Sequence, residues 1–280
     1  MNTSTKIRSG AILIALTLVS VVACKKTAET VSGDDSTAAQ DNAQIERVSN
    51  DAENIADAGA NGASGADLRT ISVGLGSCAT VTRDTTVTPH VLTIDFGPTD
   101  CLGDDLVYRR GEIIVTYTKG YKDSGSVHTI TYNHYYYDDN QVKGYKTVTN
   151  MGRNSSGNYY YSIDVHDTLV IDSTAGTIIS WAGSRTRTWT AGYSTPRRWD
   201  DEYDIYGTTT VTRASGRSVT FSVSSSTPLH VAADCRWIES GEVTATRSGG
   251  GTYTIDYGTG TCDRLATLTV GGKTYNITLR

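Results

Sequence analysis

Hydrophobic and polar residues alternate along most of the chain after about residue 72. In residues 218–224, for example, Val219, Phe221 and Val223 alternate with serine and threonine. The same alternation recurs in residues 91–96, 252–257 and 274–279. Successive side chains of a strand point to opposite sides of the sheet, so this period of two predicts strands with one buried face and one solvated face. That division is typical of antiparallel sheets.

Turn-forming residues separate these runs. The pair Gly271-Gly272 is an example, because glycine tolerates the positive φ angles that a two-residue hairpin turn requires. No strongly amphipathic helix is predicted after residue 66. We therefore expect an all-β fold, an antiparallel meander of many short strands that forms a sandwich, an open barrel or a long curved sheet.

The β domain, predicted at residues 67–280, contains an internal repeat. Residues 93–97 (Thr-Ile-Asp-Phe-Gly) recur as residues 254–258 (Thr-Ile-Asp-Tyr-Gly). A cysteine follows each copy at the same distance, Cys101 after the first and Cys262 after the second. The repeat predicts two related modules, one near residues 75–118 and the other near residues 232–280.

Four of the five cysteines belong to these modules. Cys78 and Cys101 flank one predicted hairpin, and Cys235 and Cys262 flank the equivalent hairpin. Because the open ends of a hairpin lie within disulfide reach, we expect the bonds Cys78–Cys101 and Cys235–Cys262. Each would close a loop of roughly 25 residues and contribute about 3 kcal/mol. A zinc site is the alternative, but the cysteines lack the close spacing of zinc ligands, so we expect no metal.

The N-terminus has the pattern of an export signal. Lys6 and Arg8 precede a nearly unbroken apolar run at residues 11–22. As a helix this run would rise about 18 Å, which is too short for about 30 Å of hydrocarbon. A short apolar run after a basic start is typical of a signal peptide, which we place at residues 1–23.

The four residues Val21-Val22-Ala23-Cys24 end this signal. They resemble the cleavage box of bacterial lipoproteins, which implies that Cys24 is lipidated and becomes the first residue of the exported chain. An ordinary signal peptide is the alternative. Lys25 is not acidic, and in this family that favours the outer membrane. The expected partner is therefore a membrane, bound through the lipid anchor.

Residues 24–66 contain no aromatic side chain and are rich in small and polar residues. Such a segment buries too little apolar surface to offset its ordering entropy, so we expect a lipidated flexible tether. Helical spacing of Ile45, Val48, Ala52 and Ile55 predicts a short helix within residues 42–57. We favour a transient helix over one that docks on the domain or on a partner.

The net charge of −5 becomes −7 when Lys6 and Arg8 leave with the signal peptide. Nucleic-acid-binding proteins usually carry a basic field, so no nucleic-acid partner is expected.

No motif for a hydrolase, a phosphate-binding loop, a dinucleotide site or a metal site is present, so we assign no catalytic residue and no cofactor. Asp95 and Asp256 occupy equivalent positions in the repeat, each beside a glycine turn, and a turn contact is the favoured role for both. A surface hydrolase is an alternative that would need these carboxylates to converge with His128 or His134.

Aromatic and arginine side chains supply the candidate binding residues. One hypothesis places them on an exposed platform that captures a glycan or a peptide, because rigid rings bind at low entropic cost. The alternative, which we favour, is that the rings fill the inner face while the arginines cover the outer one. The candidates are Tyr135, Tyr137, Trp181, Arg185, Arg187 and Trp189.

The Ile-Asp-aromatic-Gly blocks, their following cysteines and Asp263 after the last one also form a wider pattern. Over roughly residues 75–280 the layout resembles uncharacterised two-repeat lipoproteins of Gram-negative envelopes, a resemblance that carries no activity. We expect an envelope lipoprotein with a binding or structural role. The alternatives are a lipid or lipoprotein carrier built on an open half-barrel, and a surface hydrolase.

Overall fold

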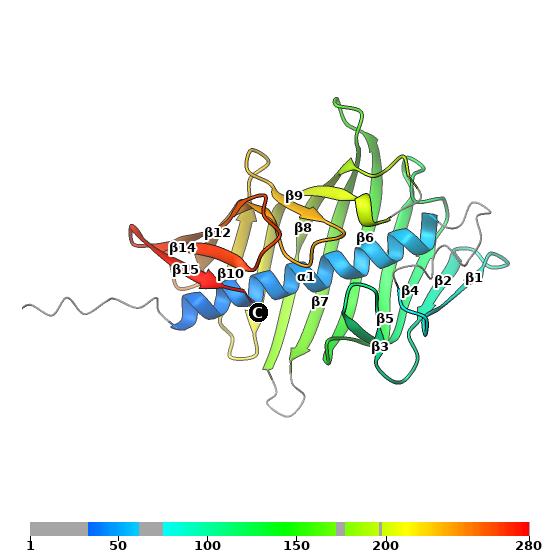
Figure 1. The fold of residues 1–280 in the computed structure, drawn as a ribbon, viewed down its shortest axis with the longest axis horizontal. Coiled ribbons are helices and arrows are strands. Elements are labelled where there is room, and N and C mark those ends of the chain that lie inside the picture. The colour runs from blue at the N-terminus through cyan, green and yellow to red at the C-terminus, as the bar shows by residue number, and fades with distance from the viewer. Residues whose placement is uncertain (1–32, 62–74, 172–176, 196–197, 280) are drawn as a thin grey trace, which may run out of the picture. The chain divides into compact units, whose positions relative to one another are not determined.

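The structure is a computed structural model, and it describes residues 33–61, 75–171, 177–195 and 198–279. In these residues a single 15-stranded sheet is accompanied by one α-helix, α1 (Gly33–Asn61), and a 3₁₀ turn, η1 (Arg198–Asp200) (Figure 1). Every strand pairing is antiparallel. The predicted all-β meander is confirmed, and it takes the form of one long sheet.

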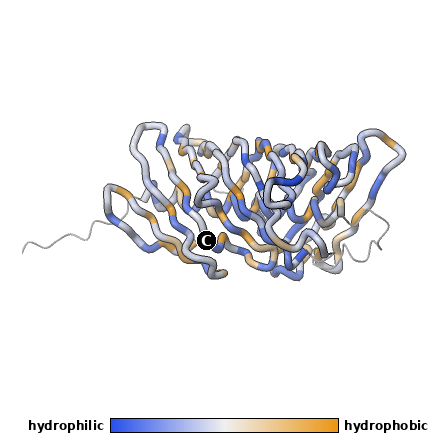
Figure 2. The backbone as a smooth tube through the Cα atoms, turned by 90° about the horizontal axis from the view of Figure 1, so that it is seen from above, coloured by the Kyte–Doolittle hydropathy of each residue, from blue (hydrophilic) through white to orange (hydrophobic). Residues whose placement is uncertain are grey.

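The strands of this sheet are β1 (Thr80–Asp84), β2 (His90–Asp95), β3 (Cys101–Leu102), β4 (Tyr108–Tyr117), β5 (Val127–Tyr137), β6 (Asn140–Arg153), β7 (Tyr159–Ile171), β8 (Thr177–Ala191), β9 (Glu202–Arg213), β10 (Ser218–Val223), β11 (Leu229–Ala232), β12 (Ser240–Arg247), β13 (Thr252–Thr259), β14 (Leu265–Val270) and β15 (Lys273–Thr278). Nearly all follow one another in the sheet as in the sequence, except that β3 pairs only with β4 and β11 bridges β9 and β12. Hydrophobic and hydrophilic positions alternate along these strands (Figure 2).

Both predicted disulfides are present. Cys78–Cys101 closes the β1–β2 hairpin and Cys235–Cys262 closes the β12–β13 hairpin, each with a Cα–Cα distance of 5.8 Å. Each hairpin also contains the same kind of turn contact. A carboxylate oxygen of Asp95 accepts a hydrogen bond from the Gly97 amide at 2.7 Å, and the repeat partner Asp256 does the same for Gly258 at 2.8 Å. These turn contacts are the role that the sequence predicted for both carboxylates.

Glycines within several strands let neighbouring strands approach closely. At Gly144 in β6 and at Gly183 in β8, an added Cβ would lie 2.1 Å from a backbone oxygen of the next strand. Gly111 in β4 and Gly241 in β12 coincide with register shifts, where a bulge bends a strand. Glycine within strands marks such bends and close approaches.

Helix α1 lies across one face of the sheet, which we call the inner face (Figure 1). No side chain between Asp35 and Asp57 is exposed, and Ile45, Val48 and Ile55 are at most 2% accessible. The favoured expectation of a flexible tether with a transient helix was therefore wrong for residues 33–61. Residues 24–32 and 62–66 of the predicted tether lie outside the described residues.

The carboxylates of α1 explain why the helix is both polar and buried. Each faces a basic side chain that projects from the inner face, so the buried charges are neutralised in pairs. The pairs are Asp35–Arg247, Asp41–Arg213, Glu46–Arg185, Asp51–Arg109, Glu53–Lys146, Glu53–Arg187 and Asp57–Arg187. In sequence the same carboxylates look solvated, because their partners are 58 to 212 residues away.

Gly183→Ala should destabilise the sheet, because the new methyl group would meet the Thr208 carbonyl oxygen at 2.1 Å. We expect a loss of about 3 kcal/mol, at the upper end of typical overpacking costs. Urea denaturation measures it. Gly249→Ala is the matched control, since a Cβ there meets nothing within 4 Å, and it should change stability by less than about 0.5 kcal/mol. Equal effects of the two substitutions would contradict the close approach.

Glu46→Gln should weaken the docking of α1, because it leaves the guanidinium of Arg185 buried without its charged partner. Breaking a buried pair by removing one partner costs about 3–5 kcal/mol. Asp34→Asn removes an exposed pair of the same helix, Asp34–Arg217, and should cost at most about 1 kcal/mol. Thermal denaturation measures the loss of stability in both variants. Similar losses would rule out a dominant role for the buried pair.

Candidate functional site

A pocket of about 410 Å³ opens beside α1 where the two disulfide-stapled modules meet. The β3–β4 turn contributes one wall, and the segment between β11 and β12 contributes another, together with η1. The floor consists of α1 side chains, namely Ala43, Arg47, Asn50, Asp51 and Asn54. Four separate parts of the sequence therefore build one concave site, which is where ligands usually bind.

Two half-buried tryptophans line the pocket, Trp199 in η1 and Trp237 before β12. Each ring lies next to a guanidinium group. The Arg198 guanidinium carbon is 4.2 Å from the Trp199 ring centre, and that of Arg47 is 5.2 Å from the Trp237 ring centre. These are cation–π distances, so the rings and the guanidinium groups hold one another in place.

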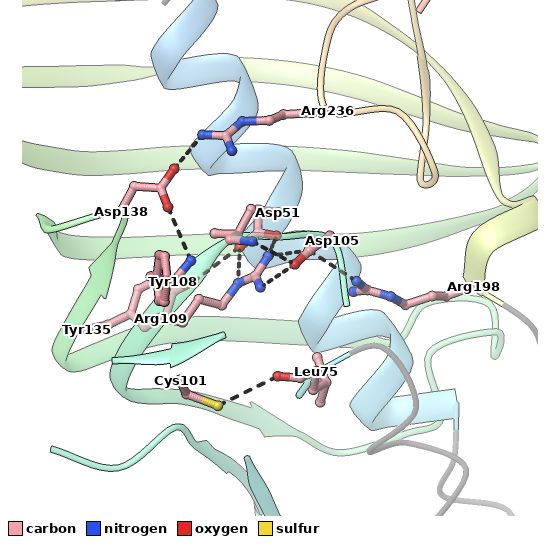
Figure 3. A network of polar contacts seen from close by, with 11 residues as sticks. Asp51, Leu75, Cys101, Asp105, Tyr108, Arg109, Tyr135, Asp138, Arg198 and Arg236 are labelled. Carbon is pink, nitrogen blue, oxygen red and sulfur yellow. Dashed lines mark hydrogen bonds and ion pairs between the residues drawn. The ribbon is translucent and has the colours of Figure 1, made fainter. Parts of the chain in front are cut away.

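Arg109 joins the floor of the pocket to its wall (Figure 3). Its side chain is fully buried and donates to Asp51 of α1 at 3.0 Å and to Asp105 of the β3–β4 turn at 2.9 Å. Burial disfavours the charge of Arg109, but the two carboxylates outweigh it and hold its pKa well above the usual value. Burial likewise acts to raise the pKa of Asp105, but Arg109 and Arg198 lower it below the usual value.

The second module brings Arg236 and Trp237 to the pocket by means of its disulfide. Cys235 lines the pocket and is bonded to Cys262, and the Trp237 amide lies 3.4 Å from the Cys235 sulfur. Arg236 in turn reaches across to Asp138 in the β5–β6 turn. The disulfide and this ion pair fix the wall of the pocket.

Of the six binding residues predicted from the sequence, only Tyr137 lines the pocket. All six are at most 8% accessible and belong to the inner face of the sheet. The exposed aromatic platform was therefore wrong. The alternative is confirmed for the rings, which fill the inner face, but wrong for Arg185 and Arg187. Those arginines also point inward, where they neutralise Glu46, Glu53 and Asp57 of α1.

Sequence reasoning missed most of the residues that build the pocket. They come from segments that are distant in the chain, and periodicity along a strand does not report which segments meet. One signal was present, because Arg198-Trp199 and Arg236-Trp237 are both Arg-Trp pairs outside the regular strand pattern.

The residues that a hydrolase would need do not converge on this pocket. Asp95 and Asp256 make their turn contacts elsewhere. His128 is buried, with its Nε2 3.0 Å from the Lys119 carbonyl oxygen, and burial lowers its pKa. His134 lies beside the side chain of Asn133.

Comparison of the chain with known protein families, with curated proteins and with solved structures finds no match. The geometry and chemistry of the pocket therefore carry the functional argument.

Proposed function

We propose that this protein is a lipid-anchored protein of the cell envelope that binds a glycan in the pocket between its two modules. The observation that carries the proposal is the convergence of Trp199 and Trp237 on one pocket of about 410 Å³ that also presents polar side chains of α1. Aromatic rings offer a rigid apolar surface to a sugar, and the amide groups of Asn50 and Asn54 can bind its hydroxyl groups.

The contents of the inner face favour this proposal over a lipid carrier. A carrier needs an apolar cavity that is open to an acyl chain, whereas α1 occupies this face. The buried side chains beneath α1 include the charged groups of Arg109, Lys146 and Arg187. An acyl chain gains nothing from such groups, because desolvated charges favour oppositely charged or polar partners.

The lipid anchor and the outer-membrane location rest on the sequence of residues 1–25, which lie outside the described residues. Lipidation at Cys24 would place the described domain close to a membrane surface, since α1 begins only nine residues later. No helix among the described residues is both long and apolar enough to cross a membrane.

Trp237→Ala should abolish most of the glycan binding, because it removes one of the two rings that a sugar would contact. A screen of immobilised glycans, followed by calorimetry on the full-length chain in detergent, should show affinity reduced by about 10- to 100-fold, as for a central contact residue. Tyr145→Ala is the control, since this ring is 46% exposed and lies outside the pocket. Binding of peptides instead of glycans, or equal binding by both variants, would overturn the proposal.

Cys24→Ser should prevent lipidation, because the thiol is the group that receives the diacylglyceryl unit and a serine hydroxyl does not replace it. In cells fed a labelled palmitate analogue, the original chain should carry the label in the outer-membrane fraction, and the variant should be unlabelled and released from it. Lys25→Asp should keep the label and move to the inner membrane. An unlabelled original chain would contradict the lipid anchor.

A further inference from the structure

Three arginines line the pocket, and two of them adjoin the same ring. The guanidinium carbon of Arg47 is 5.2 Å from the centre of Trp237, and that of Arg236 is 6.0 Å from it. Arg47 also lies 5.8 Å from the centre of Tyr137. Arg47 belongs to α1 at the floor and Arg236 to the segment between β11 and β12, so two positively charged groups from different elements adjoin one ring of the pocket.

Stacking on a ring orients a guanidinium group without using its N–H groups. These groups project from the edge of the planar fork and match the two oxygens of a carboxylate, or two oxygens of a phosphate or sulfate. Arg236 donates from one nitrogen to Asp138, and a guanidinium has five N–H groups in all. Two guanidinium groups beside one ring of the pocket therefore supply the kind of donors that bind an oxyanion.

The charges around the pocket also favour the binding of an anion. Burial lowers the pKa of Arg47, and the positive charge of Arg236 adds to this effect. Tyr137, Asp138 and Asp51 act to raise the pKa, but the net shift is downward. A bound anion would stabilise both charges. Of the lining carboxylates, Asp51 and Asp105 already bind Arg109, whereas Asp104 and Asp234 are exposed, so that solvent screens them.

We propose that Arg47 and Arg236 bind an acidic group of the ligand, a carboxylate, phosphate or sulfate, so that the pocket selects acidic over neutral glycans. This inference rests on the proposed glycan binding. Trp237 positions both guanidinium groups, and the exposed carboxylates Asp104 and Asp234 lie at the rim, where the rest of the sugar would extend.

The test uses the full-length chain in detergent and glycans in matched pairs. The two members of each pair differ in charge. One pair is oligogalacturonate and its methyl ester, and another is a sulfated or phosphorylated glycan and its unmodified form. We expect the acidic member to bind at least tenfold more tightly. Arg47→Gln and Arg236→Gln should each reduce that preference to less than about threefold, because a neutral amide replaces the charged fork.

Arg110→Gln is the matched control. Arg110 also stacks on a ring, 3.9 Å from the centre of Tyr136, and pairs with Asp100 and Asp139, but it lies outside the pocket. It should leave the preference unchanged. Thermal denaturation of each variant checks folding, and Arg236→Gln is the safer variant, since the Arg236 side chain is 35% exposed.

The outcomes separate this inference from the proposed function. Equal binding of acidic and neutral glycans would overturn the inference and leave glycan binding in place. If no glycan binds but inorganic phosphate or sulfate raises the melting temperature in an Arg47-dependent way, the oxyanion site stands and glycan binding falls. If neither glycans nor these anions bind, both are wrong.

Discussion

A helix that carries six buried or half-buried carboxylates can enter the interior of a protein only if basic groups meet it there. In this fold the inner face of the sheet supplies them, from β4, β6, β8, β9 and β12. Each charge loses its hydration on burial and regains an opposite charge at short range. This complementarity sets the position of α1, and therefore what the rest of the inner face can do.

The pocket depends on that docking because its floor is a part of α1. Arg109 binds Asp51 of the helix and Asp105 of the β3–β4 turn at once, so the same ion pairs that bury the helix also hold one wall of the site. The opposite wall is held by the Cys235–Cys262 disulfide. A binding site whose walls are fixed in advance loses little entropy when a ligand enters.

The filled interior also determines where a ligand can bind. Aromatic rings that would form a platform on an empty sheet are covered by α1, whereas Trp199 and Trp237 line a pocket where the two modules meet. The Thr- and Ser-rich outer positions of the strands make cross-strand hydroxyl contacts such as Thr210–Thr220 at 3.0 Å. The pocket is thus a product of how the ends of the sheet and the helix come together.

Features that depend on neighbouring residues could be predicted from the sequence alone. Alternation predicted the antiparallel strands, hairpin geometry predicted both disulfides, and the Asp-aromatic-Gly blocks predicted the turns at Asp95 and Asp256. The burial of the helix at residues 33–61, and the pocket that Arg47, Trp199 and Trp237 share, depend on contacts between distant segments and could not be predicted in this way. The reason is that an acidic residue in sequence looks the same whether water or a distant arginine neutralises it.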